Sequence, residues 1–194
     1  IWKINKLGII ILHIGAILLF LGGGLTGLFS KEGNIVIKEG ESSNYVEDYN
    51  YMELAIINST NKIFDQYTVF DYPLFKTSQI LQHDNFEFQI EIIDYIENCE
   101  PIRRNGPAEI YYRGMMKNFM LRELSPLKEE NMNRPGIIFS LTNTGSTADG
   151  IYGLFLGQNI PQLFSINNQE YEIIFRKQRT YLPFKIELVD FIKV

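Results

Sequence analysis

The sequence holds very few of the residues that build metal sites and nucleophilic centres, with one cysteine and two histidines among 194 residues. A single cysteine cannot form an intrachain disulfide, so we expect Cys99 to be a small buried apolar residue. One cysteine and two histidines also cannot supply a structural zinc site. The patterns G-x-S-x-G, H-E-x-x-H and C-x-x-C-H are absent, as is a phosphate-binding glycine loop. The chain is therefore not expected to be catalytic by itself, and any catalysis should be shared with other segments.

Basic residues are outnumbered by acidic ones, with 18 Lys and Arg against 23 Asp and Glu. Because Lys3 and Lys6 precede the one long apolar stretch, the remainder of the chain carries 16 basic and 23 acidic side chains, a formal charge of −7. Nucleic acid and anionic lipid surfaces are themselves negative, and like charges repel. This balance argues against either of them as a partner of that part of the chain.

The long apolar stretch, residues 7–29 (LGIIILHIGAILLFLGGGLTGLF), has no formally charged side chain. As a helix it spans roughly 34 Å, enough to cross a bilayer core of about 30 Å. A signal peptide has a shorter apolar region of roughly 7–15 residues, and no A-x-A-like cleavage site follows Phe29. A buried globular helix would normally carry charge on one face. We therefore predict an uncleaved transmembrane helix.

The residues before this stretch predict its orientation. Lys3 and Lys6 flank it, with Trp2 as an interfacial aromatic residue. By the positive-inside rule they place the N-terminus in the cytoplasm. We expect residues 1–30 to form the membrane helix with its cytoplasmic flank, and residues 31–194 to form a domain on the periplasmic, extracytoplasmic side.

His13 is the only ionisable side chain in the apolar stretch, roughly 10 Å from its cytoplasmic end. An imidazole in hydrocarbon without a partner costs several kcal/mol, so such histidines usually face a partner, a cavity, a metal or a haem. At 100° per residue His13 shares a face with Ile17, Phe20 and Gly24. His13 is therefore a candidate functional residue. A hydrogen bond to a neighbouring helix is the structural alternative.

Glycines recur every seven residues in the same stretch, at Gly8, Gly15 and Gly22, on the face nearly opposite His13. Small residues allow another helix to approach closely. The stripe predicts a packing face for a second helix.

Beyond Phe29 the apolar pattern changes to period-two alternation, which is typical of strands. The strongest strand is predicted at residues 86–96, and a tight hairpin turn at Asn167-Asn168-Gln169. No segment has a convincing helical period. The expected fold class is a mainly antiparallel β domain preceded by one transmembrane helix. Further strands are predicted at residues 34–41, 51–57, 109–112, 118–124, 136–142, 151–156, 162–166 and 170–176.

Two loops and two isolated features complete the domain. Residues 100–107 and 125–135 carry most of the turn and charge signals and are predicted to be loops. The pair Arg103-Arg104 could bind an anion, although a solvated basic pair is the simpler interpretation. His83 is interpreted as a surface or turn histidine.

An internal repeat predicts two related β-units. The segment FQIEIIDYI (residues 88–96) aligns without gaps on FKIELVDFI (residues 184–192), with five of nine positions identical. We expect Phe88 and Phe184 to occupy equivalent, core-facing positions. Chance similarity between two amphipathic strands is the alternative.

Three segments resemble, in order and over the whole chain, the ResB (CcsB) proteins of the System II cytochrome c biogenesis machinery. They are LHIGAILLFLGGGLTGLF, KEGNIVIKEGE and, most specifically, RKQRTYLPFKIELVDF. The resemblance implies a histidine-bearing membrane helix followed by a large extracytoplasmic β domain. It also implies further membrane helices outside this sequence, so we expect the chain to be a piece of a longer protein, incomplete at its C-terminal end.

The resemblance implies a haem-handling and scaffold subunit of a cytochrome c synthetase (haem lyase-type) complex in the cell inner membrane. Such a subunit helps to deliver haem across the membrane for attachment to apocytochrome c. Its expected partner is a tryptophan-rich protein of the CcsA (ResC) type, separate or fused, since only Trp2 is present here. His13 resembles the family's membrane histidine, an axial ligand of a transiently bound b-type haem, with the second histidine from the partner.

The residues alone leave an alternative of a different class. The chain could be a single-span, membrane-anchored β domain of a receptor or secretion component that binds a protein. In that case His13 would be structural. A haem absorbance band in the intact protein distinguishes the two.

Overall fold

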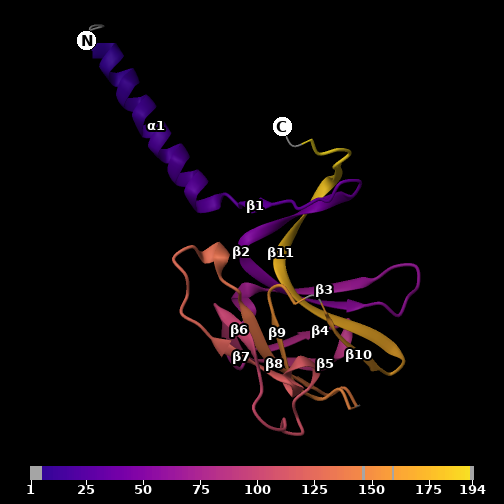
Figure 1. Cartoon of the computed structure of the whole chain (residues 1–194). Helices are drawn as coiled ribbons and strands as arrows, with labels where there is room; N and C mark the ends of the chain where they lie inside the picture. Colours follow the sequence, from indigo (N-terminus) through magenta and orange to yellow (C-terminus); the bar gives the residue numbers. More distant parts are fainter. Residues whose placement is uncertain (1–5, 146, 159, 193–194) are drawn as a thin grey trace. The chain divides into compact units, whose positions relative to one another are not determined.

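The computed structural model of the protein describes residues 6–145, 147–158 and 160–192 (Figure 1). Trp2 and Lys3, on which part of the orientation prediction rests, lie outside the described residues. The chain separates into two compact units, Ile1–Gly33 and Asn34–Val194. The first contains the apolar stretch and the second contains almost all of the strands.

The apolar stretch forms one uninterrupted helix, α1 (Leu7–Phe29), with apolar side chains on every face and no buried residue. It ends at Ser30, whose backbone turns extended and whose N–H donates to the Thr26 carbonyl at 2.8 Å. Among the described residues it is the one helix long and apolar enough to cross a membrane. This confirms the predicted helix and its capacity to span a bilayer.

The second unit is built from antiparallel strands and three short 3₁₀ turns. Each pairing between the named strands from Ser42 onward is antiparallel, as the alternating apolar pattern predicts. The elements are β1 (Gly33–Asn34), β2 (Ser42–Asn58), β3 (Gln66–Asp71), η2 (Tyr72–Leu74), β4 (Ile80–His83), β5 (Phe86–Ile96), β6 (Cys99–Arg103), η3 (Gly114–Lys117), β7 (Phe119–Glu123), η4 (Glu130–Met132), β8 (Gly136–Thr142), β9 (Gly150–Phe155), β10 (Gln162–Ile166) and β11 (Gln169–Glu187).

Two larger sheets share one hydrophobic core, and a separate hairpin covers a second, smaller cluster. The first sheet has the order β1-β2-β11-β10, with β3 also paired to β2, and the second has the order β4-β5-β8-β9. Buried side chains from β2, β5, β8, β9 and β11 meet in the main core. The hairpin β6-β7 forms its own sheet and contributes Cys99 and Leu121 to the second cluster, together with Ile96.

Strand β5 has the bounds predicted from the alternation and supplies the centre of the core. Phe88, Ile90 and Ile92 are at most 2% exposed, while Glu87 and Glu91 point to solvent. The Phe88 ring stacks on Phe86 and lies edge-on to rings of the other sheet. One face of the strand is thus fully buried between the two sheets, which is why its period-two pattern is so clear.

The predicted hairpin turn is confirmed between β10 and β11. Asn167 and Asn168 have φ of 50° and 63°, and Ile166 pairs with Gln169 across them. Positive φ at both central residues is the signature of a type I′ turn, whose twist matches that of the flanking strands. Asparagine tolerates this conformation better than most residues with a Cβ.

Several strand boundaries differ from the prediction. Only Asn34 of residues 34–41 is in a strand, because Gly40 adopts a φ of 79° in a turn. Residues 109–112 contribute one isolated bridge, from Tyr112 to Ile151. The predicted loop at residues 100–107 begins instead inside β6, whose Pro101 pairs with Leu121 in an edge hairpin that tolerates proline. Strands β3 and β4 were not predicted.

The predicted repeat of two equivalent β-units is wrong. Phe88 lies in the middle of β5, in the β4-β5-β8-β9 sheet, and is 2% exposed. Phe184 lies near the end of β11, in the other sheet, and is 57% exposed. The second segment is a strand only up to Glu187, where β11 ends. The shared alternation therefore reflects local sequence, and the two segments occupy different places in the fold.

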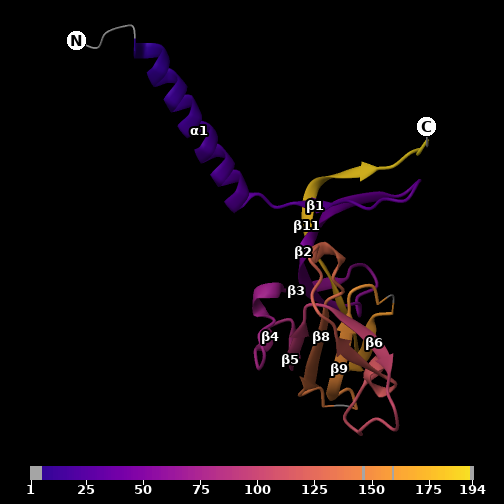
Figure 2. The ribbon, with the colours of Figure 1, turned by 60° about the vertical axis from the view of Figure 1, so that its left-hand side comes forward.

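The longest strands, β2 and β11, pair beyond the packed sheets as a two-stranded ribbon (Figures 1 and 2). A register shift separates the ribbon from the sheet, and a buried ion pair lies beside it. Glu53, 2% exposed, accepts a hydrogen bond from Arg176 Nε at 2.7 Å and another from the Arg179 backbone N–H at 3.1 Å. On the ribbon side Arg179 pairs with Glu47 at 3.0 Å. These contacts hold the two strands together where the ladder is interrupted.

Candidate functional site

His13 lies in α1, where its side chain is exposed to the helix surroundings rather than packed within the chain. Its ring nitrogen Nδ1 lies 2.7 Å from the carbonyl oxygen of Ile9, one turn earlier. A carbonyl oxygen only accepts hydrogen bonds, so Nδ1 must carry the proton. In the neutral form of the ring, the lone pair is then on Nε2, the nitrogen that does not take part in this hydrogen bond. A histidine whose other nitrogen donates to a backbone carbonyl is oriented and polarised as a metal ligand.

The face that carries His13 is open and apolar. Ile17 and Phe20, one and two turns further on, are 58% and 77% exposed. Hydrocarbon or a flat apolar cofactor would satisfy such side chains equally well, since neither requires hydrogen bonds. The site therefore offers one nitrogen donor in an apolar setting, which supplies one coordination position and no charge.

The glycines on the opposite face of α1 have open space around them within the described part of the chain. A Cβ added at Gly8, Gly15 or Gly22 would find no atom within 4 Å. Glycine is therefore not required there by any contact in the described part of the protein. Close packing of a helix from outside the chain stays a prediction, and these positions are free to accept it.

The other residues considered from the sequence form no second centre with His13. The described residues contain no group of three or more His, Cys, Asp or Glu side chains that could hold a metal ion. His83 is exposed at the end of β4 and accepts a hydrogen bond on Nδ1 from the Asn85 backbone N–H at 3.2 Å. The structure thus places His83 in a surface turn, as predicted.

Cys99 is 1% exposed, at the start of β6, and belongs to the second hydrophobic cluster. Burial raises the pKa of its thiol to about 11, against a smaller opposing effect of Arg134. A thiol is reactive as its thiolate, so this environment makes Cys99 inert. The prediction of a buried apolar cysteine is confirmed.

Sequence reasoning missed the Glu53–Arg176 pair. Its only signal is a single carboxylate within the apolar run of β2, between the buried side chains of Met52 and Leu54. The identity of the partner depends on strand pairing and cannot be found from local sequence.

Compared with models of known protein families and with curated proteins, the sequence has no significant match. Function must therefore be argued from the helix, its histidine and the β unit themselves.

Proposed function

We propose that the protein is a membrane-anchored, haem-handling and scaffold subunit of a cytochrome c synthetase, in which His13 is an axial ligand of a transiently bound b-type haem. Haem iron supplies the coordination chemistry, and apocytochrome c is the acceptor of the haem. The tryptophan-rich partner of the CcsA (ResC) type, fused or separate, provides the other histidine.

The observation that carries the proposal is the hydrogen bond from His13 Nδ1 to the Ile9 carbonyl. It leaves Nε2 with the lone pair, in the middle of an apolar surface that includes Ile17 and Phe20. Neutral imidazole is a good iron ligand. A hydrogen bond from Nδ1 to a carbonyl orients the ring and makes Nε2 a better donor to a metal. The resemblance in the three quoted sequence segments supports the same assignment.

Substitution of His13 tests this role. His13→Ala should abolish most of the haem that co-purifies with the intact complex and should lower cytochrome c maturation. His13→Gln is the sharper variant, because glutamine can still hydrogen-bond to a neighbouring helix but is a poor iron ligand. Leu19→Ala, on another face of α1 and 73% exposed, is the matched control and should change neither measurement. Full haem content and maturation in His13→Gln would reject the ligand role in favour of a structural one.

The proposal includes an orientation, with residues 1–6 in the cytoplasm and residues 31–194 outside the cell inner membrane. It is supported by Lys3, Lys6 and the formal charge of −7 that follows them. Lys62 is exposed in the loop between β2 and β3, so Lys62→Cys in a Cys99→Ala background offers one reporter thiol. A membrane-impermeant maleimide should label it from the extracytoplasmic side of intact cells or spheroplasts. Labelling only after the membrane is disrupted would show the opposite orientation, with residue 62 in the cytoplasm.

The alternative function, a membrane-anchored β domain that binds a protein, is favoured by one observation. Phe184, Phe191 and Ile192, close together in the sequence, are 57%, 67% and 76% exposed, and large exposed apolar side chains are suited to contact with another protein. A protein purified intact with its partners but without a haem absorbance band would favour this alternative.

A further inference from the structure

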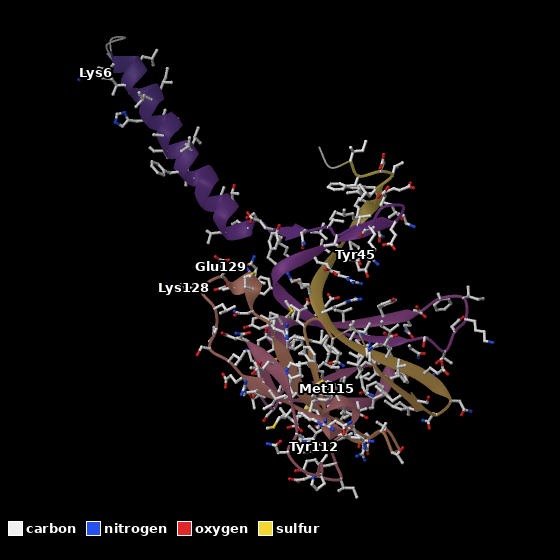
Figure 3. All side chains as sticks on the ribbon, viewed as in Figure 1. Lys6, Tyr45, Tyr112, Met115, Lys128 and Glu129 are labelled. Carbon is white, nitrogen blue, oxygen red and sulfur yellow. The ribbon has the colours of Figure 1, made fainter. Side chains whose placement is uncertain are left out.

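An apolar groove of about 640 Å³ lies between the hairpin β6-β7 and the turn that joins β9 to β10. Its lining includes Pro101, Phe119 and Met115, which lies in η3 and is labelled in Figure 3. Phe155, at the end of β9, and Leu163, in β10, also line it. Its volume is within the range of small-molecule sites, about 300–1,000 Å³.

Packing fixes part of the groove lining. Met115 and Phe155 pack against the second hydrophobic cluster. Gly114 has a φ of 53°, and a Cβ there would lie 2.0 Å from Gln162 Oε1. Glycine at this position leaves room for the Gln162 amide, and its positive φ disfavours a larger residue.

The groove leaves large apolar side chains in contact with water. Phe119, Leu163 and Ile160 are 40%, 63% and 75% exposed, and all three line it. Each square ångström of apolar surface removed from water contributes about 25 cal/mol. An apolar ligand that covers these three side chains would therefore gain substantial binding free energy.

The charge around the groove limits the choice of ligand. None of the described lining residues is charged. Arg103, however, is the cross-strand partner of Phe119, and directly opposed residues in an antiparallel pair project from the same face. Arg103 is exposed at the end of β6, and within the described part of the chain its side chain has no hydrogen bond or ion pair.

The neighbouring Arg104 is not available in the same way. Its Nε donates to the Met116 carbonyl at 3.3 Å, and its guanidinium lies 4.2 Å from the centroid of the Tyr112 ring. The adjacent arginines thus differ, since the Arg104 guanidinium contacts the backbone and a tyrosine ring. Arg103 lies on the face of the β6-β7 pair that carries Phe119, a lining residue of the groove. Guanidinium groups pair with carboxylates through two parallel hydrogen bonds.

We propose that this groove binds an amphipathic carboxylate, with the apolar body of the ligand against Met115, Phe119 and Leu163 and its carboxylate on Arg103. Long-chain fatty acids and iron porphyrins, which carry propionates, share this chemistry. The proposal does not depend on His13, which lies in the other unit of the chain.

Binding of cis-parinaric acid tests the site. The full chain is reconstituted in phosphatidylcholine nanodiscs, and the fluorescence of the fatty acid is titrated against empty nanodiscs. Wild type should bind one molecule saturably. Arg103→Gln should weaken binding about 2- to 5-fold, the range of an exposed ion pair. Leu163→Asp, at an exposed position that leaves the core intact, should weaken it more than about 10-fold because it introduces a like charge into an apolar groove.

Arg122 provides the matched control, because it lies on the opposite face of the same hairpin, in an ion pair with Glu100. Arg122→Gln should bind as wild type does. A fatty alcohol lacks the carboxylate, so its affinity, measured by displacement of the probe, should be equal in wild type and Arg103→Gln. That result would confirm that Arg103 binds the carboxylate of the ligand. No saturable binding above empty nanodiscs, or equal affinity in wild type, Arg103→Gln and Leu163→Asp, would overturn the proposal.

A competition arm identifies the source of the ligand. Iron protoporphyrin IX that displaces the probe from wild type, and displaces it less well from Arg103→Gln, assigns the groove to porphyrins. Displacement by oleate but not by iron protoporphyrin IX assigns it to fatty acids.

Discussion

The two matched phenylalanines, Phe88 and Phe184, provide a direct test of the fold. Phe88 is 2% exposed and packs between sheets, with ring centroids 4.3 Å from Phe86 and 5.1 Å from Tyr171. Its truncation removes a buried ring and leaves a cavity, so Phe88→Ala should lower the free energy of unfolding by about 3–5 kcal/mol. Phe184 is 57% exposed. Full burial of such a side chain contributes roughly 1.5–3 kcal/mol, so Phe184→Ala should cost about 1 kcal/mol or less.

Urea unfolding followed by far-ultraviolet circular dichroism measures both values, because the strands dominate the transition while α1 remains in its lipid or detergent. The dependence of the free energy on urea should be the same for both variants, since neither changes the surface exposed on unfolding by much. Equal losses of stability for the two variants would refute the reasoning. Phe184 would then be buried like Phe88, which would support the two related β-units predicted from the repeat.

Three further predictions concern the ion pair, the cysteine and the hairpin. Glu53→Gln should destabilise the β unit by about 3–5 kcal/mol, because it leaves Arg176 buried without its counter-charge. The double variant Glu53→Met with Arg176→Met should recover most of this loss of stability. A double variant no more stable than Glu53→Gln would contradict the prediction. Cys99 should resist maleimide at pH 8 in the folded protein and react after unfolding. Burial raises the pKa of the Cys99 thiol from 9.0 to about 11. The contribution of this thiol to the free energy of unfolding is therefore complete below pH 9 and is lost as the pH rises toward 11. Urea unfolding over this pH range should show that decrease in wild type and not in Cys99→Ala. Asn168→Val should cost about 1–2 kcal/mol in the same assay, since φ is 63° there, while Asn168→Gly should cost little; equal stability of the two would argue against the type I′ turn.

Sequence patterns predicted the elements whose side chains follow a clear apolar pattern. The helix α1 follows from an unbroken apolar run, and β5 follows from a strict alternation between a buried and a solvated face. The same patterns failed where pairing rather than burial decides the structure. The outer part of β11 is a strand because it pairs with β2, although side chains such as Phe184 remain exposed. Local similarity between β5 and this segment therefore suggested a repeat that the topology does not contain.

The candidate sites divide in the same way. His13 could be identified from sequence because an ionisable residue inside an apolar helix has few structural explanations. Glu53 and Arg176 are 123 positions apart, and the groove joins Phe119 to Leu163 from separate sheets. Strand pairing brings these residues together, and no local period encodes it. The hydrogen bond between His13 Nδ1 and the Ile9 carbonyl could not be predicted from sequence alone. The spacing of four residues in a helix allows this bond, but the side-chain rotamer decides whether it forms.

Imidazole rescue of a haem spectrum tests the central claim most directly. The intact complex carrying His13→Gly is purified with and without imidazole, and the Soret absorbance per protein is compared with that of wild type. The proposed ligand role predicts a weak or shifted Soret band in the variant without imidazole and partial recovery of the wild-type band with it, because the small ligand occupies the space left by the side chain. A wild-type Soret band in His13→Gly without imidazole would contradict the claim that His13 ligates haem.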